Sequence, residues 1–155
     1  MKYRRLTKEQ FEELHQEFIN FLATQQVTAD EWENLKKNKP ELAETELDVF
    51  SDLIWEGVLN KAEYLEHIAP QHMYLFHMDD DQMHAIVLNV KHDVDITTEE
   101  GYKWLRENLM DDRVEFLQAD KDYTDDKNLD KFKMIEQGAV ITKGELYTYF
   151  DNIIN

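Results

Sequence analysis

The stretch YLEHIAPQHMYLFHMDDDQMHAIVLNV, residues 64–90, decides the fold. It is rich in aromatic and β-branched side chains, and Pro70 and the acidic cluster at 79–81 interrupt it. Short runs of this composition that are bounded by turn residues are typical of β-strands joined by hairpins. The pattern predicts three strands, one near 62–68 and a hairpin pair at 72–78 and 83–90.

Upstream of this stretch, apolar side chains recur at intervals of three and four residues, the spacing of an amphipathic helix. Threonines followed three residues later by Gln or Glu form capping boxes at Thr7/Gln10 and Thr28/Glu31, which satisfy backbone donors at a helix start. Pro40 suits the first turn of a further helix, because its missing N–H has no partner there anyway. We expect three helices, from Thr7 to about Gln25, around Trp32 and Leu35, and from Pro40 to about Leu59.

Downstream of the hairpin, two more capping boxes, Thr97/Glu100 and Thr142/Glu145, mark helix starts. Between them we expect a strand around 114–117, a polar loop over 119–128 and a helix over 128–137, with a last helix over 143–154. Strands joined by hairpins, with helices kept to the flanks, favour the α+β class. The prediction is a single domain, 1–155, in which a helical subunit, 1–60, precedes an α+β subunit, 61–155. Its sheet is small and mostly antiparallel, with three to four strands flanked by helices.

Scarce residue types exclude several classes of activity. The chain has no cysteine, so it has no disulfide and no thiolate site, and its one serine, Ser51, sits in a helical pattern. Its four glycines, at 57, 101, 138 and 144, are too widely spaced for a dinucleotide-binding or Walker A loop. No apolar run approaches the roughly 18 residues of a membrane span, and the start lacks the apolar core of a signal peptide. We therefore expect a cytoplasmic protein that is not an enzyme.

The charge of the chain points to a class of partner. Thirty-four Asp and Glu against 17 Lys and Arg leave a formal charge of -17 at pH 7. Binding to nucleic acid or to an anionic membrane relies on Lys and Arg, whereas the compact basic group at the start, Lys2, Arg4 and Arg5, is small. The charge therefore argues against both as direct ligands and favours a partner with a basic protein surface.

A candidate metal site lies at the tip of the predicted hairpin. A two-residue turn at Asp80-Asp81 and a four-residue loop over 79–82 give the same pairing, which places His77 opposite His84. Directly opposed side chains have Cβ atoms about 4.5–5.5 Å apart, close enough for two imidazoles to share a metal whose shell carboxylates complete. The candidate ligands are His77, His84, Asp79 and Asp81. The alternative is that both histidines mark the point where the core gives way to solvent.

A candidate partner-binding surface, which we call the acidic stripe, lies on the third predicted helix. Its acidic residues recur at spacings of three and four, which places them side by side next to the apolar face. A tryptophan borders them, and Trp is enriched where binding energy concentrates in interfaces. The acidic stripe consists of Glu41, Glu44, Asp48, Asp52, Trp55 and Glu56. The alternatives are a solvated outer face and, for Trp55, packing inside the subunit.

Three segments carry a resemblance that spans nearly the whole chain: MKYRRLTKEQFEELHQEFINFLA at 1–23, ELDVFSDLIWEGVLNKAEYLEHI at 46–68 and DKFKMIEQGAVITKGELYTYF at 130–150. They resemble a family of small acidic uncharacterised bacterial proteins, a domain of unknown function whose members are sometimes mislabelled histidyl-tRNA synthetase. The chain is too short for a synthetase catalytic domain and lacks a nucleotide-binding glycine loop. The resemblance therefore implies a lineage, but neither a mechanism nor site residues.

Three hypotheses of function follow. The first is a non-catalytic cytoplasmic interaction protein, without a cofactor, that docks the acidic stripe onto a basic protein surface. The second is a metal-binding protein or metal-dependent hydrolase that uses the His/Asp cluster at the hairpin tip. The third is a structural domain with no dedicated small-molecule site. The pattern of residues leaves the oligomeric state open.

Overall fold

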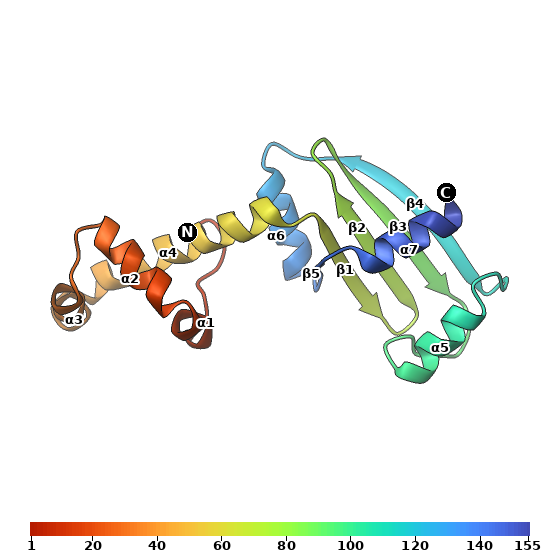
Figure 1. The fold of residues 1–155 in the computed structure, drawn as a ribbon, viewed down its shortest axis with the longest axis horizontal. Helices are drawn as coiled ribbons and strands as arrows, with labels where there is room; N and C mark the ends of the chain where they lie inside the picture. Colours follow the sequence, from red (N-terminus) through yellow and green to blue (C-terminus); the bar gives the residue numbers. More distant parts are fainter. The chain divides into compact units, whose positions relative to one another are not determined.

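The computed structural model describes residues 1–155 and has the α+β fold that the sequence predicts (Figure 1). The chain divides into two compact units, Met1–Asn60 and Lys61–Asn155. The helical unit is built from α1 (Lys8–Glu13), α2 (His15–Thr24), α3 (Ala29–Asn38) and α4 (Pro40–Lys61). The second unit contains β1 (Tyr64–Ala69), β2 (His72–Met78), β3 (Gln82–Val90), α5 (Glu99–Glu107), β4 (Val114–Asp122), α6 (Lys127–Glu136), β5 (Val140–Thr142) and α7 (Glu145–Ile154).

The helical unit has four helices, so the prediction of three is wrong at its first member. Thr7 and Gln10 form the predicted capping box, but the helix that they start has only six residues, and α2 begins after Leu14. The break lets Phe11 of α1 and Phe18 of α2 both reach the ring of Phe50 on α4, at centroid distances of 5.9 and 5.0 Å. A core built on one central aromatic ring therefore overrides the continuous helical pattern of the sequence.

The sheet has five antiparallel strands in the order β4-β3-β2-β1-β5, one more than the upper limit of the prediction (Figure 1). The additional strand, β5, has only three residues and pairs with β1. The predicted loop over 119–128 is wrong in its first four residues, because β4 continues to Asp122 and pairs there with Gln82–Ala85. A strand at the sheet edge can carry polar side chains on both faces, which explains why its pattern resembles a loop.

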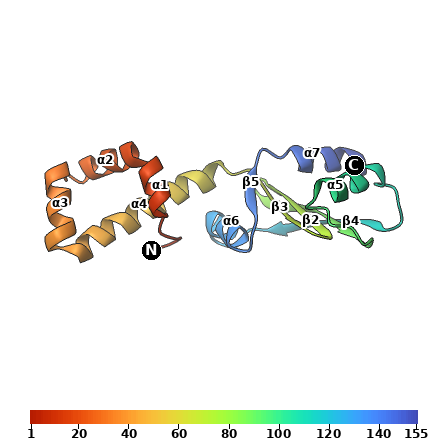
Figure 2. The same cartoon turned by 90° about the horizontal axis from the view of Figure 1, so that it is seen from below.

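Helices cover the two faces of the sheet unequally (Figure 2). α5 and α7 pack on one face, which we call the closed face. There Leu105 of α5 and Phe150 of α7 are buried together with the strand residues Met73, Leu75, Ile86 and Leu88. α6 packs on the opposite face, which we call the α6 face, near the β2–β3 hairpin tip, where Leu65, Met78 and Ala139 are buried. The buried strand residues alternate with period two, as expected for a sheet with distinct faces.

Tertiary contacts move two predicted helix starts. Thr98, not Thr97, caps α5 and accepts a hydrogen bond from the amide of Gly101 at 3.0 Å, whereas Thr97 bonds to Asp95. α7 begins after Gly144 without a capping box. The backbone of Gly144 itself is in the left-handed region, at φ +82°. A Cβ at Gly144 would lie 2.5 Å from the ring of Tyr64, so a residue with a side chain does not fit there.

None of the helices combines the length with the hydrophobicity that crossing a membrane requires.

Candidate functional site

The acidic stripe on α4 faces the chain's own basic N-terminal segment, which we define as residues 2–5. The carboxylate of Asp52 accepts two consecutive backbone amides, from Lys2 at 2.6 Å and from Tyr3 at 2.9 Å. Two neighbouring amides that converge on one carboxylate fix the position of this part of the backbone through charge-assisted hydrogen bonds. Asp52 therefore anchors the backbone of the segment.

The basic and aromatic side chains of the segment contact the rest of the stripe. Arg5 donates from Nε to Asp48 at 2.7 Å. The Arg4 guanidinium lies over the Trp55 ring, 5.1 Å from its centroid, while the Trp55 indole N–H donates to the Arg4 carbonyl at 3.1 Å. This pairing of a cation–π contact with a backbone hydrogen bond makes Trp55 an anchor for an arginine.

The far end of the stripe binds the remaining two residues of the segment. Lys2 pairs with Glu56 at 3.6 Å, and the Tyr3 hydroxyl donates to the same carboxylate. Burial, followed by the hydrogen bond to Glu56, raises the pKa of Tyr3 to about 12. Tyr3 therefore acts as a neutral donor at any physiological pH.

The near end of the stripe extends beyond the segment. Glu41 and Glu44 are exposed on the first turns of α4. The hydrogen bond to Asp48 is the main cause that raises the pKa of Arg5, and the charge of Glu44 adds to it. The structure thus brings all six predicted stripe residues onto one side of α4, and the N-terminal segment contacts four of them.

The second candidate site is the tip of the β2–β3 hairpin, where the predicted pairing of His77 with His84 is confirmed. Their rings lie 5.9 Å apart between centroids. The His77 ring stacks on Tyr64 at a centroid distance of 4.6 Å and an interplanar angle of 10°. His77 therefore joins the aromatic layer of the closed face, as in the alternative interpretation of this pair.

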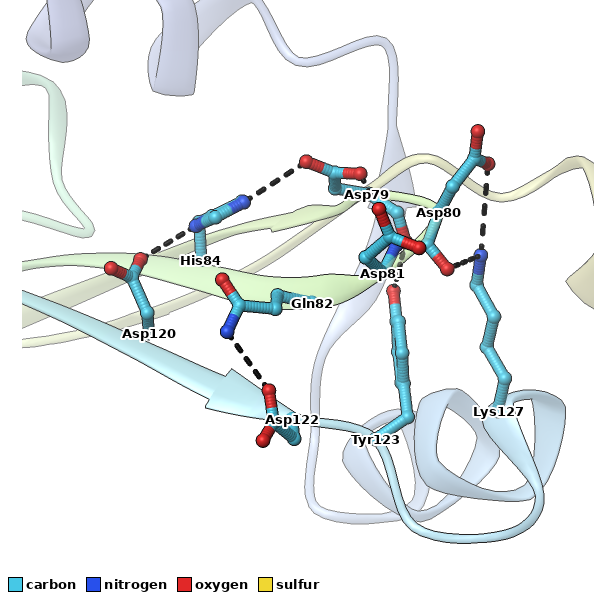
Figure 3. A network of polar contacts seen from close by, with 9 residues as sticks. All are labelled: Asp79, Asp80, Asp81, Gln82, His84, Asp120, Asp122, Tyr123 and Lys127. Atoms are coloured by element: carbon cyan, nitrogen blue, oxygen red, sulfur yellow. Dashed lines mark hydrogen bonds and ion pairs between the residues drawn. The ribbon is translucent and has the colours of Figure 1, made fainter.

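His84 lies between two carboxylates (Figure 3). Its Nδ1 is 2.6 Å from Asp120 on β4, and its Nε2 is 3.1 Å from Asp79 in the hairpin turn. The hydrogen bond to Asp120 and then the bond to Asp79 raise the pKa of His84, and the same contact lowers the pKa of Asp79. Protonated His84 donates to both carboxylates at once, so it ties the turn to the neighbouring strand.

Further contacts hold the tip against the connection from β4 to α6 (Figure 3). The Tyr123 hydroxyl donates to the Asp79 carbonyl at 2.6 Å, and Gln82 donates to Asp122 at 2.8 Å. The Lys127 ammonium lies 3.9 Å from the carboxylate of Asp80. Burial, together with the charges of nearby aspartates, raises the pKa of Tyr123 to about 12.

The structure brings together only part of the predicted set of metal ligands. His77, His84 and Asp79 come together, but Asp81 is exposed, and only its backbone amide contacts Asp79, at 3.3 Å. No group of three or more His, Asp or Glu side chains is arranged to hold a metal ion. Both ring nitrogens of His84 already have carboxylate partners, and the His77 ring stacks on a tyrosine.

Sequence reasoning missed two parts of these sites. The polar pattern of 119–128 predicts a loop for Asp120, and only the extension of β4 places it opposite His84. The sequence shows that the N-terminal segment is basic, but its contact with α4 joins residues about 50 positions apart, which spacing does not reveal. The available signal is the charge complementarity between this basic segment and the most ordered acidic surface.

Comparison with known proteins gives a family but no activity. The chain belongs to DUF6495, a family of unknown function, and the family model matches residues 1–155. Neither the curated proteins nor the solved structures contain a match to this chain.

Proposed function

We propose that this DUF6495 protein is a non-catalytic binding protein whose acidic stripe on α4 receives an extended basic segment of another protein. The observation that carries the proposal is the fit of residues 2–5 on the stripe. Asp52 receives consecutive backbone amides from this segment, while Asp48 and Trp55 each receive an arginine. We infer that the N-terminal segment occupies the place of the partner and indicates what the partner looks like.

The ion pairs between the segment and the stripe are partly exposed to solvent, so another basic segment can replace them readily. The Arg5–Asp48 pair has side chains that are 39% and 32% exposed, and the Lys2–Glu56 pair has side chains that are 41% exposed on both sides. Ion pairs with this exposure contribute at most about 1 kcal/mol each. A partner with more basic residues has further acidic surface to contact, because the stripe continues to Glu41 and Glu44.

The tethered segment competes with any partner. A short tether gives an effective concentration in the millimolar range, so an external basic segment must bind more tightly or make additional contacts. In this proposal the partner is a basic protein, and neither nucleic acid nor a membrane is a direct ligand. The lack of cysteine accords with a cytoplasmic location for such a complex.

The direct test uses the segment itself as the probe. A synthetic peptide with the sequence MKYRRL is titrated into the chain that lacks residues 1–5, with Trp55 fluorescence and calorimetry as readouts. We expect saturable binding at low salt, at least tenfold weaker binding to the intact chain, and loss of affinity between about 0.01 and 0.15 M salt, as the screening length falls from about 30 to 8 Å.

Two matched variants control the test. Asp52→Asn in the shortened chain should lose peptide binding, whereas Asp30→Asn, an exposed aspartate on α3, should retain it. Because removal of the segment can affect folding, Arg4→Ser with Arg5→Ser in the full-length chain provides a second way to free the stripe. The proposal is wrong if the peptide binds the Asp52→Asn and Asp30→Asn variants equally.

A further inference from the structure

A groove lies on the α6 face, where α6 leaves part of the sheet uncovered. It consists of two adjoining cavities of about 440 and 410 Å³, which share Phe76, Met134 and Gln137 as lining residues. Cavities of roughly 300–1,000 Å³ are typical of sites for small molecules. The groove is distant in the sequence from the acidic stripe, and the inference drawn from it is independent of the proposed function.

Small side chains in neighbouring strands create the groove. Phe76, Ala85 and Ala119 are direct cross-strand partners on β2, β3 and β4, so one row of the sheet carries two alanines next to an aromatic ring. Met83 and Met134, the latter on α6, complete the apolar lining. Methionine adapts its shape to an irregular apolar ligand, so this lining suits an aliphatic or aromatic body rather than a polar one.

Two lysines and two aspartates line the groove, a more even balance than the charge of -17 of the whole chain. Lys121 on β4 and Lys133 on α6 line the groove, are exposed, and form no ion pair. The two aspartates at the groove are already engaged elsewhere. Asp130 accepts from the amide and the hydroxyl of Thr124 at 2.8 and 2.7 Å, and Asp120 binds His84.

The carboxylate of Asp120 points away from the groove. Side chains alternate across a strand, so the carboxylate of Asp120 points to the closed face with His84, while Ala119 and Lys121 point to the α6 face. Figure 3 shows the Asp120 carboxylate turned toward the His84 ring. The groove therefore presents an apolar floor with two lysines and without a free carboxylate.

We propose that this groove binds a small anionic amphiphile, namely a carboxylate with an aliphatic or aromatic body. The body lies on Phe76, Met83 and Met134, and the carboxylate is held by Lys121 and Lys133. The long apolar stems of lysines line such a site while their ammonium groups meet the charged end. The complementarity of charge and hydrophobicity selects this ligand over a neutral lipid or a cation.

The test compares an acid with its neutral analogue. Decanoate and decan-1-ol, both below their aggregation limits, are titrated against protein that carries the fluorescent anion 1-anilinonaphthalene-8-sulfonate, and displacement is measured. We expect decanoate to bind the wild-type chain at least tenfold more tightly than decan-1-ol. The double variant Lys121→Gln/Lys133→Gln should reduce this preference to less than threefold, whereas the matched variant Lys103→Gln/Lys143→Gln should leave it unchanged.

A second variant tests the location. Ala119→Trp fills the groove from an exposed edge position, and we expect it to abolish decanoate binding while thermal unfolding stays cooperative. The proposal is overturned if acid and alcohol bind equally, or if Ala119→Trp binds decanoate as the wild type does. It is also overturned if sedimentation shows that Ala119→Trp dissociates a dimer, because a second copy would then be the occupant of the groove.

Discussion

The same five strands form both faces of the sheet, but helices cover the two faces to different extents. On the closed face, which α5 and α7 cover, the strand residues Met73 and Leu88 are 0% exposed. On the α6 face, the row of cross-strand partners Tyr74, Val87 and Leu117 is not fully buried, and Leu117 is 48% exposed. Burial contributes roughly 25 cal/mol per Å² of apolar surface, so the closed face supplies the stability of this unit and the α6 face retains surface for contacts.

The largest expected effect tests that assignment on α7. Phe150 is 0% exposed, and its ring lies 6.1 Å from that of Phe116 on β4. Phe150→Ala removes a buried ring and leaves a cavity, so urea unfolding should show a loss of about 3–5 kcal/mol. Ile153→Ala, at a position 40% exposed on the same helix, should cost less than about 1 kcal/mol. Equal losses at the two positions would show that the closed face is not the main core.

The attachment of α7 to the closed face gives the next largest effect. Gly144→Ala adds a Cβ that meets the Tyr64 ring at 2.5 Å on a backbone with φ +82°. The expected cost in thermal unfolding is about 1–3 kcal/mol. Gly57→Ala, in the last two turns of α4 with nothing within 4 Å, should instead stabilise the chain by about 0.5–1 kcal/mol. Effects of the same sign would contradict the close approach of Gly144 to Tyr64.

The sequence predicts the closed face better than the α6 face, for physical reasons. Alternation over 64–90 defines the hairpin and its register, because a shift by one residue would turn every buried side chain to solvent. β5 has three residues, too few to show a period, and the end of β4 is polar because it lies at an edge. The groove depends on Ala85 and Ala119 being neighbours, and Ala119 lies in the part of β4 that the sequence predicts as a loop.

The polar end of the closed face has an expected dependence on pH. Because contacts with Asp120 and Asp79 raise the pKa of His84, protonated His84 stabilises the fold fully below its ordinary pKa of about 6.5. This contribution is lost as the pH rises through the raised pKa. His84→Gln should therefore lower the melting temperature by about 1–3 °C near pH 6 and by less near pH 9.

A second variant identifies the source of this pH dependence. Asp120→Asn removes the larger cause of the raised pKa of His84, so its melting temperature should also approach that of the wild type as the pH rises. Differences from the wild type that stay constant between pH 6 and pH 9 in both variants would show that the contacts of His84 act through shape rather than charge.

The smallest expected effect lies on the open part of the α6 face. Leu117→Lys places a charge at a position 48% exposed on the edge strand, outside the groove lining. Such a substitution should change the free energy of unfolding by no more than about 0.5 kcal/mol, and urea unfolding should give the same result at low and high protein concentration. A cost of several kcal/mol that grows with protein concentration would mean that a second copy buries this row. The two faces would then differ in what covers them, helices on one and a partner chain on the other, rather than in how much is covered.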